Sequence, residues 1–438
     1  MSVEEIPGTD RKYGLIAFDA DGQERPTPSG LMSQTLIDKA ASEPITNVFF
    51  FCHGWKGDLP AAKDQYGRWM KALVTSSDMD RAAQVFPGFN PLFIGLHWPS
   101  LPWGDEELRG GGAFAAGGGI GPEALLGAYL ERLGDRPAIR APLEIILNEA
   151  RRNAAPDTLP PHVRQAYLDL NSALGLGSEG VAAAPDADRE GFDPDDSYDA
   201  GNEEETDFGG GLDLGGILGP LRQLSYWTMK KRARTVGEGG MHTFLKSLQQ
   251  ATASKGTRIH LMGHSFGTIV ISGMLGGPNA TGTLPRPVDS TVLVQGAVSL
   301  WSYADAIPFG SAGRGYFNRL LGDGKVAGPL VITQSRWDSA VGVLYPLASR
   351  IKGSADFGAG LPEYGAIGAY GIQGLSGGVA TDSKMLPASG VYNFQKRKVY
   401  NLDGSQFIAK KEGASGAHSD IAGPEVAHVI WEAAFASA

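Results

Sequence analysis

The chain has 438 residues, of which 42% are hydrophobic and 20% charged, so it can bury a sizeable core in one large domain or two modest ones. Its single cysteine, Cys52, excludes an internal disulfide framework, and no run of about 18 apolar residues predicts a transmembrane helix. Eleven acidic residues and one arginine in 186–207 carry a net charge of −10. This equals the formal charge of the whole chain, so the remainder is neutral and has no general field to attract nucleic acid. Because residues 1–14 lack the apolar stretch of a secretory signal, we expect a soluble, cytoplasmic protein.

The first hundred residues alternate between apolar strands and helices. Residues 45–52 (ITNVFFFC) are apolar at nearly every position, which is typical of a parallel sheet covered by helices on both faces. Further strands are expected at 13–19 and 90–98, and helices at 33–41 and 61–74. This alternation predicts an α/β fold with a doubly wound, mostly parallel sheet.

The alternation stops after Pro99 and resumes at Thr257. We expect a core of residues 1–103 and 237–438, with 104–236 inserted as a helical cap. Helices are expected in the cap at 123–133, 143–152 and 163–174, whereas the acidic segment 180–210 is predicted to be a disordered or mobile loop. Leucine-rich helical spacing follows and indicates either a mobile lid over an apolar pocket or the buried face of a cap helix: Leu214, Ile217, Leu218, Leu221 and Leu224.

Two charged patterns in the cap have functional and structural interpretations. Asp186, Asp188, Glu190 and Gly191 have the spacing of a calcium-binding loop, but Ser197 occupies the twelfth position and flanking helices are missing, which argues against calcium. A basic cluster is expected to be a solvated helix face rather than a nucleic-acid site: Lys230, Lys231, Arg232 and Arg234.

A strand, a tight turn and a helix follow one another directly in residues 257–275 (TRIHLMGHSFGTIVISGML). The turn is a G-x-S-x-G in which Gly263 and Gly267 flank Ser265, and glycine relieves the crowding where a strand turns straight into a helix. A second match at 374–378 lacks both the strand and the helix. The context therefore predicts Ser265 as a nucleophile at the carboxyl edge of the sheet.

The rest of the chain completes the sheet. Strands are expected at 291–300, 330–334 and 398–402, and a closing helix at 424–435. Residues 353–390 are rich in glycine and are expected to form long loops near the site.

A nucleophilic serine needs a base, and the base needs an orienting acid. In this strand–turn–helix architecture both follow the serine in the chain, which leaves two histidines. His428 lies within the closing helix pattern, where packing or solvent exposure is expected. His418 lies in a loop of small residues after the last strand, and we predict it as the base.

Asp338 follows the strand at 330–334 and is the predicted acid. Asp305, which follows the strand at 291–300, is the reserve. Asp403 and Asp420 are expected to be surface or capping residues.

Attack on an ester creates an oxyanion, which fixed backbone amides can stabilise. We predict that Phe266, at the start of the helix, and Trp55, in the loop after the strand at 45–52, donate these amides, with Lys56 as the next choice. His53, Lys56 and His264 are expected on the substrate side, although holding its loop by hydrogen bonds suits His53 better than proton transfer. No metal ligands are predicted.

Together these residues resemble the α/β-hydrolase superfamily: HGW at 53–55 after an apolar strand, GHSFG at 263–267, Asp338 after LVITQ, and His418 before the terminal helix. The resemblance covers about 1–100 and 237–438. It implies an eight-stranded, mostly parallel sheet, acyl-enzyme chemistry and no cofactor, and it does not separate esterases, lipases, thioesterases, amidases and peptidases.

We therefore expect an esterase- or lipase-like serine hydrolase acting on a small-molecule carboxylic ester. Aromatic residues near the predicted site and the leucine-rich cap favour an apolar acyl group: Trp55, Trp98, Trp103 and Phe266. The alternatives are an amidase or peptidase with the same triad, or a non-catalytic binding module whose contact is the acidic segment.

Overall fold

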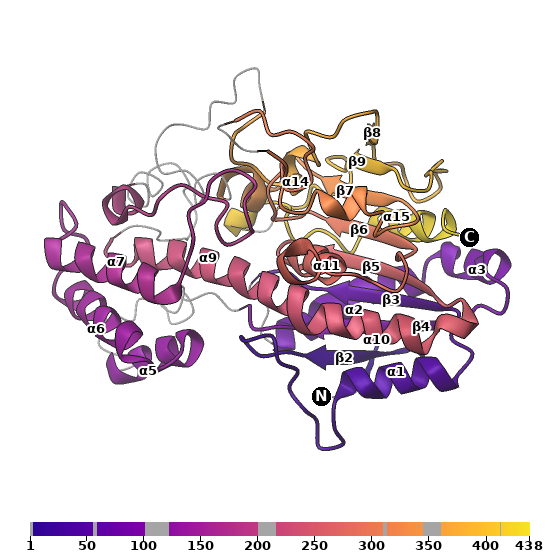
Figure 1. The fold of residues 1–438 in the computed structure, drawn as a ribbon, viewed down its shortest axis with the longest axis horizontal. Coiled ribbons are helices and arrows are strands. Elements are labelled where there is room, and N and C mark those ends of the chain that lie inside the picture. The colour runs from indigo at the N-terminus through magenta and orange to yellow at the C-terminus, as the bar shows by residue number, and fades with distance from the viewer. Residues whose placement is uncertain are drawn as a thin grey trace.

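The computed structural model describes residues 3–55, 59–100, 122–199, 216–309, 313–344, 361–411 and 413–438. Nine strands of this part of the chain form one sheet in the order β1-β2-β4-β3-β5-β6-β7-β9-β8, in which β1 is antiparallel to β2 and every other pair is parallel (Figure 1). The strands are β1 (Val3–Glu5), β2 (Lys12–Ala17), β3 (Asn47–Cys52), β4 (Pro91–His97), β5 (Arg258–His264), β6 (Ser290–Val294), β7 (Leu330–Gln334), β8 (Ala380–Lys384) and β9 (Val399–Asp403). The predicted α/β class with a mostly parallel sheet is confirmed.

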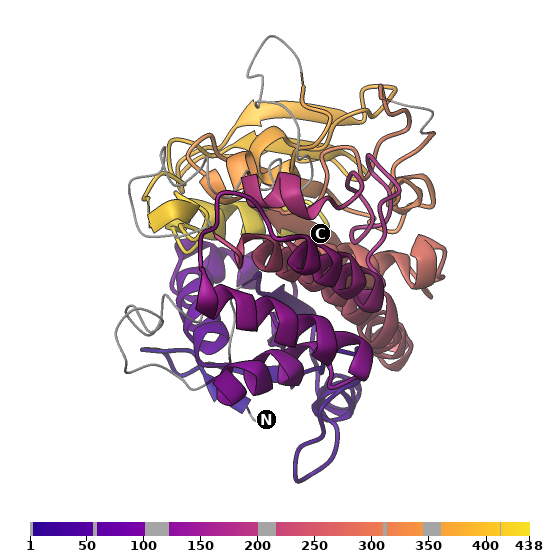
Figure 2. The ribbon, with the colours of Figure 1, turned by 90° about the vertical axis from the view of Figure 1, so that its left-hand side faces the viewer.

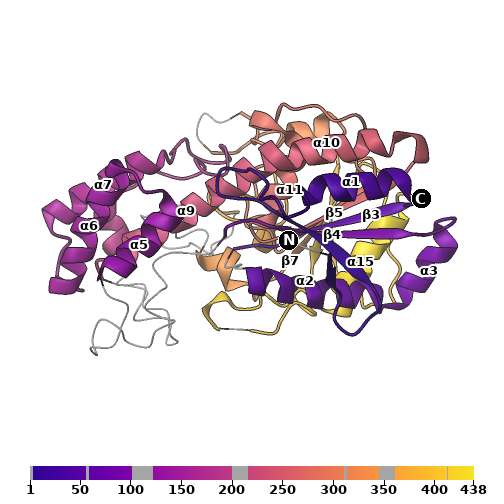
Figure 3. The same ribbon diagram turned by 90° about the horizontal axis from the view of Figure 1, so that it is seen from below.

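Helices cover both faces of the sheet, as the apolar pattern of β3 predicts. Val48 and Phe50 belong to the apolar core on one face, and Phe49 and Phe51 to the core on the other, because successive strand residues point to opposite sides. Figure 3 shows the two layers, α1 (Met32–Ser42), α10 (His242–Ala251) and α11 (Gly267–Gly276) on one side and α2 (Leu59–Val74), α3 (Ser77–Val85) and α15 (Pro424–Phe435) on the other. Two short helices lie in the connections, α12 (Arg319–Gly322) and α14 (Ile367–Tyr370).

Three helices of the predicted cap stand apart from the sheet and face the viewer in Figure 2: α5 (Pro122–Leu133), α6 (Pro137–Arg152) and α7 (Pro161–Leu174). They pack on one another and on α9 (Gly219–Val236), which continues through a π-helical turn at Gly237–Met241 into α10 of the core. A Cβ atom on Gly237 would lie 2.6 Å from the carbonyl oxygen of Val270, so α9 approaches α11 closely at this turn. One helical run therefore crosses the predicted boundary between cap and core.

The leucine-rich row of the cap is buried. Ile217, Leu218, Leu221 and Leu224 all lie within the main core cluster, while Leu214 falls outside the described residues. Leu221 and Leu224 belong to a buried face of α9, and Ile217 and Leu218 lie in the turn before it.

The acidic segment corrects two expectations. Over 180–199 it is not a solvated loop but packs along α9, where the Asp188 carboxylate lies 2.6 Å from Lys230 Nζ and Asp186 lies 2.7 Å from Arg234. Lys230 is fully buried, so the basic cluster is not simply a solvated face. Lys230 and Arg234 thus pair with the carboxylates that calcium would need. Each ion pair compensates charges that would be costly to bury alone. Residues 200–210 lie outside the described residues.

Strand β8 is a further difference from the prediction, since it lies in a stretch expected to be loops and gives nine strands instead of eight. Thr381–Lys384 are all exposed, so this edge strand has no apolar pattern by which the sequence could reveal it. No helix within the described residues is long and apolar enough to cross a bilayer.

Candidate active site

Ser265 lies in the turn between β5 and α11. Its backbone is in the left-handed region, with φ of +55°, a strained conformation for a side chain other than glycine. The carbonyl of Ser265 accepts hydrogen bonds from the amide of Ala297 at 3.1 Å and from the Thr268 hydroxyl at 2.6 Å, and its amide donates to the carbonyl of Val294 at 3.2 Å. Hydrogen bonds to residues at and just after the end of β6, and to the first turn of α11, thus stabilise this strained conformation.

Three glycines make room for this turn. A Cβ atom on Gly54 would lie 2.4 Å from the Cβ of Ser265, and one on Gly267 would lie 2.4 Å from the carbonyl oxygen of Cys52. On Gly263 it would lie 2.6 Å from the carbonyl oxygen of Gly267. The glycines of the G-x-S-x-G therefore have the steric function that the sequence predicts, and Gly54 is a third requirement from the loop after β3.

The structure brings the predicted acid and base together. Asp338 follows β7 and His418 follows β9, and His418 Nδ1 lies 2.8 Å from Asp338 Oδ2. Gly416, with φ of +60°, pairs with Asp338, and the amide of Ala417 donates to the carbonyl of Trp337 at 2.8 Å. A Cβ on Gly416 would lie 2.2 Å from that same carbonyl oxygen, so only glycine allows the two loops to meet this closely.

The side chain of Asp338 is fully buried and its oxygens are held by donors from three segments. Besides His418, Oδ2 accepts a hydrogen bond from Gln295 Nε2 at 2.8 Å, and Oδ1 accepts one from the amide of Val341 at 3.2 Å. Because Asp338 accepts the Nδ1 proton, the Nε2 atom of His418 is left as the basic nitrogen of the ring.

His264, which directly precedes Ser265, holds the loop of His418. Its Nε2 donates to the carbonyl of His418 at 2.9 Å and its Nδ1 accepts from Gln65 Nε2 at 3.1 Å, and the two imidazole rings lie 4.7 Å apart. Burial, and then the nearby His418, lower the pKa of His264 well below its usual range, so the ring is neutral. Both ring nitrogens of His264 are therefore occupied, one of them by the loop of the predicted base, and neither is free to bind substrate.

The His418 loop contacts His264, which is the residue before Ser265. Within the described residues, however, no hydrogen bond joins the Ser265 hydroxyl to the His418 imidazole. The His418 side chain is 12% exposed and Ser265 is 4% exposed. Catalytic hydrogen bonds are often long in unliganded enzymes and shorten when substrate binds. The structure thus supplies an imidazole that Asp338 orients and that packs on His264, the residue before the serine.

The predicted oxyanion donors lie in two adjoining turns. In the part of the chain that the structure describes, the amide of Phe266 has no acceptor, as expected at the start of a helix. The Trp55 ring packs against the Phe266 ring at 5.9 Å between centroids, and Gly54 touches Ser265. Lys56 and Trp103 lie outside the described residues.

His53 and Trp98 are not at the substrate side. His53 is fully buried, its Nδ1 donates to the carbonyl of Gly54 at 2.8 Å, and its Nε2 accepts from the amide of Trp98 at 3.4 Å. Burial, followed by the neighbouring His97, lowers the pKa of His53 to about 3. Trp98 is also fully buried and stacks on this ring, with the planes 7° apart. His53 therefore holds the Gly54 turn, which corrects its assignment to substrate binding and the use of Trp98 as an acyl contact.

The reserve acid lies elsewhere. Asp305 accepts hydrogen bonds from the hydroxyl and amide of Ser376, at 2.6 and 2.9 Å, and from Asn318 at 2.8 Å. The Ser376 hydroxyl is the main group that lowers the pKa of Asp305. Ser376, in the second G-x-S-x-G, and Asp305, the reserve acid, thus stabilise the local loop structure through their hydrogen bonds. Asp403 and Asp420 accept from nearby backbone amides, as predicted for capping residues.

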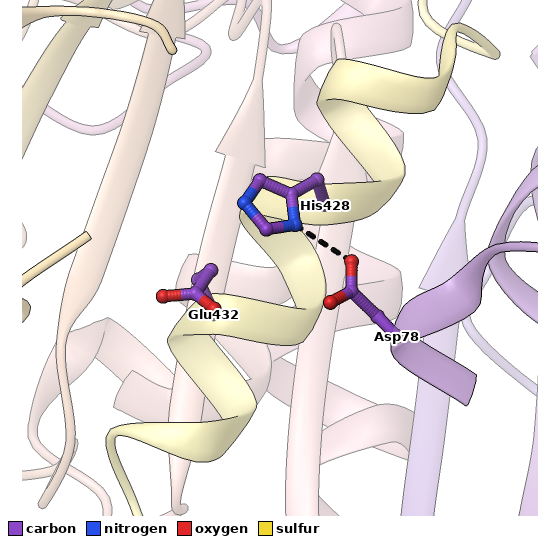
Figure 4. A group of neighbouring side chains, drawn as sticks. All are labelled: Asp78, His428 and Glu432. Atoms are coloured by element: carbon purple, nitrogen blue, oxygen red, sulfur yellow. Dashed lines mark hydrogen bonds and ion pairs between the residues drawn. The ribbon is translucent and has the colours of Figure 1, made fainter. Parts of the chain in front are cut away.

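One buried cluster has the composition of a metal site. Potential ligand atoms of Asp78, His428 and Glu432 all lie within 4.8 Å of one another (Figure 4). However, His428 Nδ1 is 2.6 Å from Asp78 Oδ2, its Nε2 donates to the carbonyl of Gly390 at 2.8 Å, and Arg81 pairs with Glu432. His428 and Arg81 already contact the carboxylates that a metal would need, so the group fits a clamp between α3 and α15 better than a metal centre. His428 is packed, as its helix pattern predicts.

Three residues near the site were not identified from the sequence: Gln295, Gln65 and Tyr226. Gln295 directly follows the apolar strand β6, and a polar residue just after a buried strand is a signal that could have identified it. Gln65 and Tyr226 lie on helices whose sequence patterns do not distinguish them from other surface or core positions.

Comparisons of the chain with models of known protein families, with curated proteins and with solved structures found no match.

Proposed function

We propose that this protein is a serine hydrolase of α/β-hydrolase type that cleaves carboxylic esters. The fold assignment is supported by the strand order β1-β2-β4-β3-β5-β6-β7-β9, with only β1 antiparallel, and by the cap inserted between β4 and β5. The nucleophile, acid and base follow β5, β7 and β9 at the carboxyl edge of this sheet, where ligands of open α/β sheets bind.

The observation that carries the proposal is the hydrogen bond between His418 and Asp338, in loops 80 residues apart in the chain. The buried carboxylate orients an imidazole whose loop contacts the residue before a strained serine, and a triad built from these groups could activate the hydroxyl. Asp305, Ser376 and His428 have the same residue types, but their partners hold loops and helices together.

In the proposed reaction Ser265 Oγ attacks the acyl carbonyl carbon, and its proton passes to Nε2 of His418. The Asp338 carboxylate stabilises the resulting imidazolium, and the amides of Phe266 and Trp55 donate to the oxyanion. His418 then returns the proton to the leaving alkoxide, which leaves an acyl group on Ser265. A water molecule, deprotonated by His418, attacks this ester and releases the acid. Each lost oxyanion donor would raise the barrier by about 3 kcal/mol.

An apolar acyl group is supported by aromatic residues contributed by both core and cap. The ring of Tyr226, on α9, lies 5.0 Å from the Phe266 ring and 5.7 Å from the Trp55 ring, both in edge-on contact. These three rings lie beside the turn that contains Ser265, and they would form the apolar surroundings of an acyl group bound there. We expect Tyr226→Ala to increase kcat/KM for bulky acyl groups relative to acetyl esters.

The test is hydrolysis of chromogenic esters with acyl chains of two to sixteen carbons by wild type and Ser265→Ala. Turnover by wild type that Ser265→Ala abolishes supports the proposal, and wild type without turnover or labelling by a fluorophosphonate refutes it. Matched anilides test amide cleavage: faster turnover of anilides than of esters would favour the amidase alternative.

A further inference from the structure

Gln295 lies at the end of β6 in an unusual backbone conformation. Its φ is +46°, in the left-handed region, where a glycine or asparagine is more easily accommodated. The side chain is fully buried. Around it, the amide of Gly368 donates to the carbonyl of Gly296 at 2.9 Å, and a Cβ on Gly296 would lie 2.6 Å from Ile367. A large polar side chain therefore occupies a position whose left-handed backbone conformation is unfavourable for it.

The hydrogen bonds of Gln295 determine which way its amide points. The Thr333 hydroxyl accepts from the backbone amide of Gln295 at 3.2 Å, so its own proton is directed to Gln295 Oε1 at 3.1 Å. With the oxygen facing Thr333, the NH₂ group faces Asp338 and donates to Oδ2 at 2.8 Å. A flipped amide would place its oxygen against the carboxylate and lose both bonds.

The oxygen that Gln295 contacts is the one that faces the base. Asp338 Oδ2 receives both the Gln295 amide and the Nδ1–H of His418, each at 2.8 Å. Rotation of the carboxylate would break one of these bonds and the bond from the amide of Val341 to Oδ1. The Gln295 donor also interacts with the negative charge of the Asp338 carboxylate, which would otherwise interact with the imidazole alone.

We infer that Gln295 is a positioning residue for the catalytic acid: it fixes the carboxylate of Asp338 in the rotation that orients His418. This inference rests on the proposed function and extends it, because it gives the strained end of β6 a role in the reaction. The side chain of Gln295 is fully buried, and within the described residues no hydrogen bond joins it to Ser265, so we expect its effect to pass through Asp338.

Two variants separate this role from a role in folding. Gln295→Gly suits the backbone and removes the amide, whereas Gln295→Met keeps the length of the side chain and removes the donor. Arg397→Gly is the control, because Arg397 is exposed and has φ of +60° far from the triad in the chain. We expect both Gln295 variants to fold, kcat to fall roughly 10- to 100-fold, and KM to change less than about twofold. The acid limb of the kcat/KM profile should move to higher pH, because an unshared carboxylate holds the imidazolium proton more strongly. Arg397→Gly should leave all three unchanged.

A second readout does not depend on turnover. The proton between His418 Nδ1 and Asp338 should give a low-field ¹H NMR signal that is absent in His418→Ala. Loss of the Gln295 donor should shift or broaden this signal while Arg397→Gly preserves it. Folded Gln295 variants with a wild-type signal, kcat and pH profile would overturn the inference. If wild type hydrolyses no ester, the proposed function fails, and the NMR signal alone decides whether Gln295 positions Asp338.

Discussion

Substitution of Gly54 by alanine tests the packing of the Ser265 turn. The new Cβ would lie 2.4 Å from the Cβ of Ser265 and 3.0 Å from the carbonyl oxygen of His264. Carbon atoms in contact are about 3.5–4.0 Å apart, so the two turns must separate by about 1 Å. A misplacement of about 1 Å at a reacting group can reduce the rate about 100-fold, equivalent to about 2.7 kcal/mol of barrier. Overpacking should also lower the free energy of unfolding by about 1–3 kcal/mol.

The assay compares kcat/KM for a short chromogenic ester, corrected for the folded fraction measured by circular dichroism, with the thermal midpoint. Gly127→Ala is the matched control, because a Cβ there has no neighbour within 4 Å and the position lies in α5. This control should keep full activity and gain up to about 1 kcal/mol in stability from the helix propensity of alanine. If Gly54→Ala keeps kcat/KM within twofold of wild type, the proposed contact between this turn and Ser265 is wrong.

Three further predictions concern the acid, a buried histidine and a buried ion pair. Asp338→Asn should lower kcat by about 10³-fold or more without unfolding the chain, and steady-state kinetics showing near-normal turnover would exclude Asp338 as the orienting acid. Burial lowers the pKa of His260 to about 4, so the unfolded chain binds a proton there below about pH 6.5 and the folded chain does not. Stability should therefore fall from pH 6.5 towards pH 4 by up to about 1.4 kcal/mol per pH unit, and urea titrations at pH 7 and 5 should show a smaller loss for His260→Gln. Lys230→Met removes the buried ammonium that lies 2.6 Å from the Asp188 carboxylate and should cost about 3–5 kcal/mol in urea unfolding; adding Asp188→Leu should recover most of this, and no recovery would contradict the pairing.

Much of the sheet could be predicted from local pattern because its central strands are buried on both faces. All six residues of β3 are buried, and β7 and α15 have the predicted bounds. Strand β8 could not be predicted, since its side chains are almost all exposed and its pairing with β9 is its defining feature. Local pattern also fails for 186–188, because the cations that neutralise these acids are more than 40 residues away on α9.

The candidate site likewise has a part that could be predicted from the sequence and a part that could not. Ser265, Asp338 and His418 follow from chain order and from the segments that precede them, whereas the orientation of each group depends on contacts between distant loops. The contacts of Gln295 and His264 appear only when the end of β6 meets the loop of Asp338 and the loop of His418 meets β5. Side-chain partners across the sheet edge are set by tertiary packing, which one sequence does not encode locally.

The central claim is that Ser265 is a nucleophile activated by His418. Intact-mass spectrometry and peptide mapping after incubation with a fluorophosphonate test this most directly, alongside Ser265→Ala and His418→Ala. The account predicts one adduct per chain, located on Ser265, absent in Ser265→Ala and formed at least about 100-fold more slowly in His418→Ala. An unlabelled wild type, an adduct on another residue, or an undiminished rate in His418→Ala would contradict it.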